Sequence, residues 1–325
     1  MKTGRHCPVG GKEKINVNRK AWKTTVYGSP GAVIRSNMIG GKYMNETKSG
    51  HEIKKDARTA ILLVASSTTR DGAKKILENC VDAFKNAYPN SVVRYAIASE
   101  LVRQVMAKEG NIVSSPVGAL AKLIDEGFTK MIVQPLYITP GDGLHVLYST
   151  VSTFNEFSGK HVSFGIDGIL IGKPLLMNTE DYWSAADAIT AYFGMPAENE
   201  ATVLVSPIDE GGADPSLCQL QLMMDEKTGG RIVIGTSCGY PGADWVLQRL
   251  KHINARKVTL APLTLIPGKH TDYELDGSGP DSWKNKLEAA GYTVSVSSKI
   301  LGESPQIAAL FIQSVADTGK SHGFL

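Results

Sequence analysis

"APLTLIPGKH", residues 261–270, repeats a phrase that occurs earlier in the chain as "QPLYITPGDG", residues 134–143. Pro262 corresponds to Pro135, and the Pro-Gly pair at 267–268 corresponds to the pair at 140–141, all at one constant offset. Each copy begins as an apolar, β-rich run and ends in a Pro-Gly turn, which is typical of a strand and the loop that leaves it. Only the second copy carries a histidine just beyond the turn, His270.

The sequence around each copy predicts alternating strands and helices. Short apolar runs predict the strands, and apolar residues at helical spacing predict the helices between them. In the first half, strands are expected at 59–66, 91–98 and 130–138, with helices at 71–89 and 117–127. In the second half, strands are expected at 201–206, 230–237 and 256–266, with helices near 216–227 and at 243–253. This alternation favours an α/β fold with mostly parallel sheets flanked by helices.

The repeated phrase therefore indicates a duplicated domain. We expect a basic N-terminal arm (1–58), a first α/β half (59–177) and a second α/β half (178–302). A further strand is predicted at 168–176, with helices at 178–194, 281–291 and 303–316. The C-terminal helix, 303–318, is expected to return to the first half.

Composition indicates a globular protein of ordinary type. Of the 325 residues, 42% are hydrophobic and 21% are charged. No apolar run reaches the roughly 18–20 residues of a membrane helix, and the first residues lack the apolar core of a secretory signal. The four cysteines have no C-x-x-C spacing, so a disulfide framework is not expected. These features predict a cytoplasmic protein.

Positive charge is concentrated at the N-terminus. Residues 1–58 contain 13 Lys or Arg and 4 Asp or Glu, whereas the whole chain has a net charge of only +3. The arm has few aromatic residues and no nucleic-acid-binding motif, so no nucleic-acid partner is expected. The preferred interpretation is a solvated extension or a segment that contacts another protein or a second copy of the chain.

In the second half, three turns that leave strands carry the residues of interest. Pro207, Cys238 and His270 follow successive strands at spacings of 31 and 32 residues. Ligands of open α/β sheets bind at the carboxyl ends of the strands, so these turns should converge on one site. A thiolate and an imidazole would suit cobalt, iron(II) or zinc better than magnesium or calcium. A small buried cysteine without a metal is the alternative reading of Cys238.

Other polar residues at these exits are also candidates. Asp209 and Glu210 follow the same strand as Pro207 and could supply an oxygen ligand or accept a proton. In the first half, the hydroxyls of Ser66, Ser67 and Thr68 follow the first strand, where they either bind a carboxylate or cap a helix. Tyr137 ends the third strand, and His145 lies on a predicted short helix facing the cleft. No dinucleotide or P-loop fingerprint occurs, so no nucleotide cofactor is expected.

An ordered set of phrases resembles the anaerobic sirohydrochlorin cobaltochelatases. From Thr59 to Val315, these phrases are "ILLVASSTT", "IVQPLYITPGDG", "GKPLL", "IGTSCGYPG", "APLTLIPGKH" with "DGSGPDSWKNKLEAAGY", and "LGESPQIAALFI". The resemblance implies a chelatase-like fold of two Rossmann-like halves with a tetrapyrrole in the cleft between them. It also implies insertion of a divalent metal, with cobalt in first place and iron, nickel or zinc as alternatives.

The same resemblance implies which positions bind the metal. Two histidines and one glutamate bind the metal in the family. The first histidine corresponds to Pro207, the glutamate to Cys238 and the second histidine to His270. One family ligand is thus retained. The residues expected around the tetrapyrrole are Ser66, Ser67, Thr68, Tyr137, His145, Pro207 and Tyr240.

Three hypotheses follow from this pattern. In the first, the protein is a chelatase in which Cys238 and His270 hold the metal, while Asp209, Glu210 or His270 removes protons. In the second, it is a non-catalytic carrier that retains a tetrapyrrole (haem, sirohaem or a corrinoid), with Cys238 or His270 as an axial ligand. In the third, it is a scaffold subunit whose cleft has no ligand. Fold alone does not decide between them.

Overall fold

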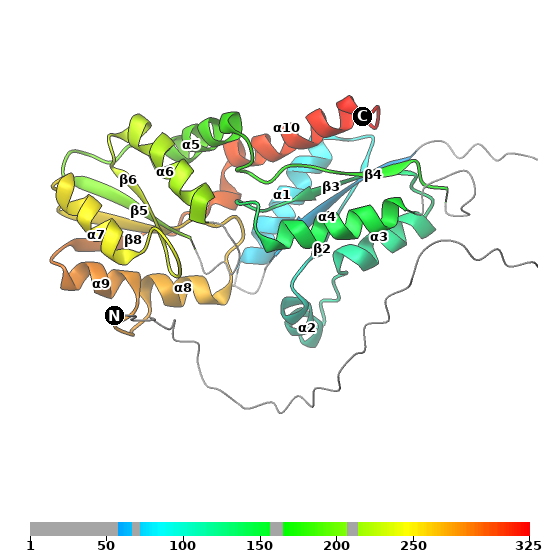
Figure 1. Cartoon of the computed structure of the whole chain (residues 1–325). Coiled ribbons are helices and arrows are strands. Elements are labelled where there is room, and N and C mark those ends of the chain that lie inside the picture. The colour runs from blue at the N-terminus through cyan, green and yellow to red at the C-terminus, as the bar shows by residue number, and fades with distance from the viewer. Residues whose placement is uncertain (1–57, 67–71, 157–164, 207–213) are drawn as a thin grey trace, which may run out of the picture. The chain divides into compact units, whose positions relative to one another are not determined.

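The architecture consists of two parallel four-stranded sheets with helices on their faces (Figure 1). A computed structural model of the chain describes residues 58–66, 72–156, 165–206 and 214–325, without the side chains of Lys269 and His270. The strand orders are β2-β1-β3-β4 and β6-β5-β7-β8, so the two sheets have the same topology. The predicted α/β fold of two duplicated Rossmann-like halves is confirmed.

The elements follow the predicted alternation closely. The first sheet comprises β1 (Thr59–Ala65), β2 (Val92–Ile97), β3 (Lys130–Pro135) and β4 (Gly168–Ile171). Its helices are α1 (Ala73–Ala87), α2 (Glu100–Lys108), α3 (Pro116–Asp125) and α4 (Asp142–Asn155). The second sheet comprises β5 (Glu200–Ser206), β6 (Ile232–Thr236), β7 (Lys257–Pro262) and β8 (Thr293–Val296). Its helices are α5 (Thr179–Phe193), α6 (Asp214–Thr228), α7 (Ala243–His252), α8 (Lys269–Asp276) and α9 (Trp283–Ala289), and the chain ends with the 3₁₀ turn η1 (Leu301–Glu303) and α10 (Pro305–Ser321).

The repeated phrase occupies the same place in both sheets. Pro135 pairs with Val64 of the neighbouring strand, and Pro262 pairs with Val205 in the same way. The next residue of each copy donates its backbone N–H to that neighbour, Leu136 to Val64 O at 2.8 Å and Leu263 to Val205 O at 2.7 Å. Each copy is therefore the carboxyl end of a central strand, as the sequence predicts.

The two halves share one hydrophobic core. The largest cluster of buried side chains includes Ile61 and Leu63 from β1 together with Leu204 and Ile234 from the second sheet. Side chains of α1, α5, α6 and α10 complete this cluster. The opposite face of the first sheet is covered by α3 and α4, and that of the second by α7, α8 and α9. The carboxyl ends of the strands are thus held in a fixed arrangement by packing on both faces.

The last helix packs against the first half of the chain. α10 contacts α1, β3 and β4 as well as α5. The Ser314 hydroxyl accepts a hydrogen bond of 2.8 Å from Lys173 N, just beyond β4. The Tyr88 hydroxyl, next to the end of α1, donates to Ile312 O at 2.6 Å. These bonds tie residues more than 140 positions apart in the sequence.

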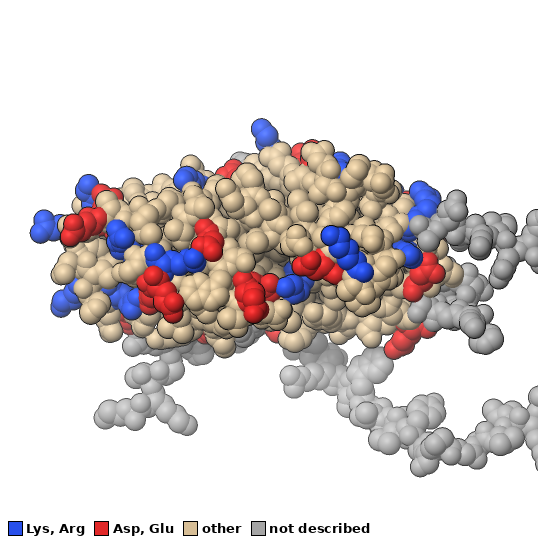
Figure 2. All heavy atoms as spheres, turned by 90° about the horizontal axis from the view of Figure 1, so that it is seen from above, with Lys and Arg blue, Asp and Glu red and all other residues tan. Residues whose placement is uncertain are grey.

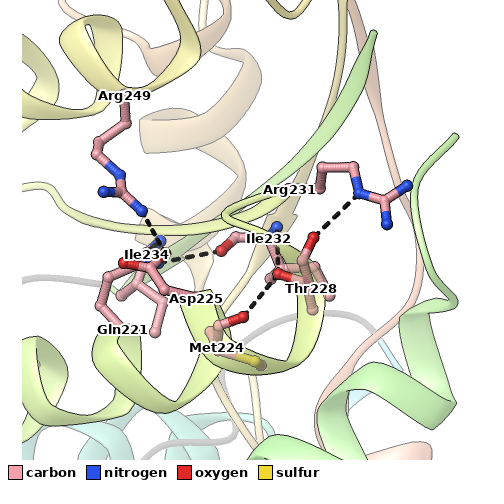
Figure 3. A network of polar contacts seen from close by, with 8 residues as sticks. All are labelled: Gln221, Met224, Asp225, Thr228, Arg231, Ile232, Ile234 and Arg249. Atoms are coloured by element: carbon pink, nitrogen blue, oxygen red, sulfur yellow. Dashed lines mark hydrogen bonds and ion pairs between the residues drawn. The ribbon is translucent and has the colours of Figure 1, made fainter. Parts of the chain in front are cut away.

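Side chains of α6 pair with the free edge of β6, the outermost strand of its sheet (Figure 3). Gln221 Oε1 accepts from Ile234 N at 2.6 Å, and Gln221 Nε2 donates to Ile232 O at 3.2 Å. Thr228 Oγ1 accepts from Ile232 N at 3.2 Å. The backbone N–H and C=O groups of an unpaired strand edge can hydrogen-bond to another chain and cause aggregation. Here the helix supplies partners for these groups, which fixes the strand that leads into the Cys238 loop.

Charges are mixed on the face seen in Figure 2. Lys and Arg side chains are interspersed there with Asp and Glu among a larger uncharged surface. Ion pairs on the described surface include Lys173 with Asp181 at 2.6 Å and Lys227 with Asp187. None of the helices within the described ranges has both the length and the apolarity needed to span a membrane.

Candidate functional site

A cavity of about 310 Å³ lies where the strands of both halves end. Its wall combines the residues that follow β1, β2 and β3 with the end of β5 and the residues that follow β7. The lining residues are Ser66, Ala98, Ser99, Leu136, Tyr137, Ile138, Thr139, Gly141, Gly143, Leu144, Ser206, Leu263, Thr264, Leu265 and Ile266. Both copies of the repeated phrase therefore face the same space, which is where ligands of open α/β sheets bind.

The cavity wall is apolar with hydroxyl groups and carries no charged side chain among its described residues. Two helices begin at it, α2 after Ser99 and α4 after Gly141. The Ser99 hydroxyl caps α2 by accepting from Val102 N at 3.3 Å, whereas Gly141 provides no side-chain cap. Helix N-termini attract negative charge, so this wall favours an apolar ligand with anionic substituents.

Tyr137 lines the cavity as a protonated phenol. A Cβ placed on Gly143 would lie 3.4 Å from its ring, which shows how closely the ring packs on the first turn of α4. Burial raises the pKa of Tyr137 to about 12. At neutral pH the side chain therefore offers an apolar face and a donor, and it cannot act as a base.

The loop after β6 carries Cys238 and is anchored at several points. Thr236 Oγ1 donates to Cys238 O at 2.9 Å, and the Tyr240 backbone N–H donates to Asp214 Oδ2 at 2.9 Å. Gly239 has φ 118°, and a Cβ there would lie 2.6 Å from Asp214 Oδ1, so only glycine fits between the loop and α6. Contacts with Asp214 of α6 thus hold the loop in its conformation.

A second anchor connects this loop to α8. Ser237 Oγ donates to Glu274 Oε2 at 2.8 Å and accepts from Trp283 Nε1 at 3.3 Å. The Ser237 backbone N–H donates to Ser206 O at 3.2 Å, and Ser206 lines the cavity. The loop after β6, helix α8 and the cavity wall therefore belong to one connected structure.

The structure places the predicted second-half residues as follows. His270 is the second residue of α8, directly beyond the second Pro-Gly turn. Cys238 lies half-buried in the loop that follows β6, and the described cysteines Cys80 and Cys218 are free. Pro207, Asp209 and Glu210 lie outside the described residues.

The first-half residues divide between the cavity and the outer surface. Ser66 and Tyr137 line the cavity, while Ser67 and Thr68 lie outside the described residues. His145 was expected to face the cleft, but it does not line the cavity. In α4, Gly143 and Leu144 line the cavity, and the helical turn carries position 145 to an exposed hollow beside Val117.

Tyr240 is 52% exposed, packs edge-on against Trp245 and is not among the described residues of the cavity wall. The described side chains contain no group of three or more His, Cys, Asp and Glu that could hold a metal ion. Sequence reasoning did not identify Asp214 or Glu274 as anchors of the Cys238 loop. Glu274 gave a usable signal, because it stands four residues after His270 in a helical segment.

Comparisons with known proteins agree with this architecture. The sequence profile of the family described as "Cobalt chelatase (CbiK)" matches residues 59–320. The "Sirohydrochlorin cobaltochelatase CbiKC" of Nitratidesulfovibrio vulgaris is 26% identical over 236 residues, which cover 72% of this chain and 81% of the relative. The "Sirohydrochlorin cobaltochelatase" of Salmonella typhimurium is 24% identical over 258 residues, covering 78% of this chain and 94% of the relative.

Solved structures share the fold at lower identity. SirB from Bacillus subtilis with Fe3+ superimposes with a TM-score of 0.54 at 16% identity, covering 82% of this chain and 98% of that protein. DR2241 from Deinococcus radiodurans, a multi-domain protein with structural similarity to chelatases, gives a TM-score of 0.52 at 16% identity. That comparison covers 80% of this chain and 55% of DR2241.

Proposed function

Since the chain belongs to the cobalt chelatase (CbiK) family, we propose that it inserts a divalent metal ion into sirohydrochlorin or a related tetrapyrrole. Cobalt is the metal we place first, with iron, nickel and zinc as alternatives. The observation that carries the proposal is the cavity formed by both copies of the repeated phrase at the ends of five strands. The metal and the macrocycle are both substrates of this reaction.

The lining of the cavity suits part of a carboxylated macrocycle. Leu136, Leu263 and Ile266 give apolar contact for the flat ring system. Hydroxyl groups and the N-termini of α2 and α4 supply partners for peripheral carboxylates. The phenol of Tyr137 adds a donor beside the ring.

The reaction exchanges one divalent metal for two pyrrole N–H protons, so it needs a metal-binding group and a proton acceptor. We assign His270 to the metal and to proton removal, since α8 begins at Lys269, three residues after Ile266 of the cavity wall. Asp209 and Glu210 are proposed as further proton acceptors. Cys238 is proposed as a second metal ligand through its thiolate, which is the form of cysteine that binds metals.

An anaerobic absorbance titration tests this function. Purified protein is mixed with sirohydrochlorin and then with cobalt(II), alongside a His270→Ala variant and a sample without protein. We expect the free-base spectrum to convert to the metallated one faster with the protein, and the acceleration to be lost in the variant.

Two other outcomes would reject the catalytic proposal. A spectral shift on mixing with the tetrapyrrole, without faster metallation, would identify a non-catalytic carrier. An unchanged spectrum would show that the cleft does not take this macrocycle.

A further inference from the structure

Glu274 on α8 faces the loop that follows β6. Its Oε2 atom accepts the 2.8 Å hydrogen bond from Ser237 Oγ, and the side chain is half-buried. Through the Ser237 backbone the loop is bonded to Ser206, which lines the cavity. A carboxylate is therefore held close to the wall of the proposed active site, at the junction of two strand exits.

The support behind this carboxylate is rigid. Ser237 Oγ also accepts from the indole N–H of Trp283, which is only 3% exposed. The indole packs so tightly on β6 that a Cβ at Gly235 would lie 2.5 Å from its ring. Trp283 is thus fixed by the sheet, Ser237 is fixed by Trp283, and the Ser237 hydroxyl proton points to Glu274.

The register of α8 brings Glu274 onto the same face as His270. The helix spans Lys269–Asp276, and residues four apart in a helix lie one above the other. Two ligating residues at this spacing can hold one divalent metal ion, as the paired residues of H-E-x-x-H helices do. An imidazole and a carboxylate are both suitable ligands for cobalt, iron, nickel and zinc.

We propose that Glu274 is an oxygen ligand of the incoming divalent metal ion, one helical turn from His270, and that Ser237 orients its carboxylate. This inference rests on the proposed function, because it assigns the metal of that reaction. Carboxylates that bind metals are ordinarily also hydrogen-bonded by outer residues, which is the part that Ser237 and Trp283 play here. The metal site then requires no sulfur from Cys238.

The test measures cobalt(II) binding by the full chain in the absence of tetrapyrrole. Affinity is determined by competition with a chromophoric chelator, and the ligand field is followed by the visible absorbance of bound cobalt. The variants are Glu274→Gln and Ser237→Ala, with Asp276→Asn as the matched control. Asp276 is a carboxylate on the same helix, but it pairs with Lys284 at 2.7 Å and lies two residues, or about 200°, around the helix from Glu274.

We expect Glu274→Gln to weaken cobalt binding by at least about ten-fold and to change the absorbance of bound cobalt. Ser237→Ala should weaken binding by a smaller factor, and Asp276→Asn should leave it unchanged. Circular dichroism melts establish that each variant is folded. Equal affinities and spectra for the wild type and Glu274→Gln, or no cobalt binding by the wild type, would overturn the inference.

The same samples are then assayed for metallation of sirohydrochlorin, which separates this inference from the proposed function. Cobalt binding that depends on Glu274 in a protein that does not metallate would support the ligand and reject the reaction. Metallation that is unaffected by Glu274→Gln would support the reaction and reject the ligand. A Cys238→Ser variant completes the set, because cobalt binding that is lost there and kept in Glu274→Gln would assign the metal to the cysteine instead.

Discussion

Removing the Gln221 side chain should destabilise the protein far more than removing a polar side chain from the surface. Gln221 is 3% exposed and pairs with the free edge of β6 through Ile234 N and Ile232 O. Gln221→Ala leaves both backbone groups buried without a partner. Each unsatisfied group costs about 1–3 kcal/mol, so the expected loss in the free energy of unfolding is about 2–6 kcal/mol.

The loss is measured by thermal melts followed by circular dichroism. At about 2–4 °C per kcal/mol, the value for domains of about 150–250 residues, the midpoint should fall by roughly 4–24 °C. Gln221→Leu keeps most of the side-chain volume and should lose a similar amount, since the hydrogen bonds and not the packing are decisive. The control is Gln248→Ala, an exposed glutamine on α7, which should shift the midpoint by less than about 2 °C.

A midpoint for Gln221→Leu equal to that of the wild type would refute this reasoning, because the strand edge would then be satisfied without the helix. An exposed edge also invites pairing between chains. We therefore expect Gln221→Ala to aggregate on heating at concentrations where Gln248→Ala remains clear, as light scattering would record.

Three further predictions concern Cys80 in α1, the Cys238 loop and Tyr137. Burial raises the pKa of Cys80 from 9.0 to about 11, so the unfolded chain ionises first and the free energy of unfolding should fall as pH rises from about 9 to 11. Cys80→Ala should reduce that slope by up to about 1.4 kcal/mol per pH unit in urea melts, and parallel slopes would contradict the assignment. Gly239→Ala places a side chain against Asp214 at positive φ and should lower both the melting midpoint and the metallation rate. The control Gly242→Ala, at φ −87° with its nearest contact at 3.4 Å, should be tolerated. Equal effects of the two substitutions would show that the loop is not constrained at Gly239. Because the pKa of Tyr137 is about 12, Tyr137→Phe should leave the pH profile of metallation between about pH 6 and 9 unaltered, and a missing limb would identify Tyr137 as a titrating group.

The order of apolar residues along the chain predicted most of the fold, because the core strands are buried on both faces. Such strands read as short continuous apolar runs, and the helices between them keep one apolar side. β8 was not predicted as a strand, because its four residues are largely exposed and pair only with β7 at the edge of the sheet. α2 was also missed, although Ser99 caps it and Val102 and Met106 form its buried side.

The site could be predicted only in outline. Equivalent positions after successive strands predict that the exits around Cys238 and His270 belong to one region, because parallel strands end at the same edge of a sheet. The orientation of side chains at those exits could not be predicted in the same way. His145 was expected at the cleft, but the cavity is reached from positions 143 and 144 of α4, so one step around the helix moved the histidine to the outer surface.

By itself, the sequence determined the duplicated α/β architecture, the place of the repeated phrase and the cobalt chelatase likeness. These depend on apolar periodicity and on ordered phrases, which are properties of neighbouring residues. Only the tertiary structure decided that Glu274 meets Ser237, 37 residues earlier, and that Gln221 completes the edge of β6. Those contacts arise where separate helices pack on one sheet, and the spacing of residues along the chain carries no information about which side chains meet there.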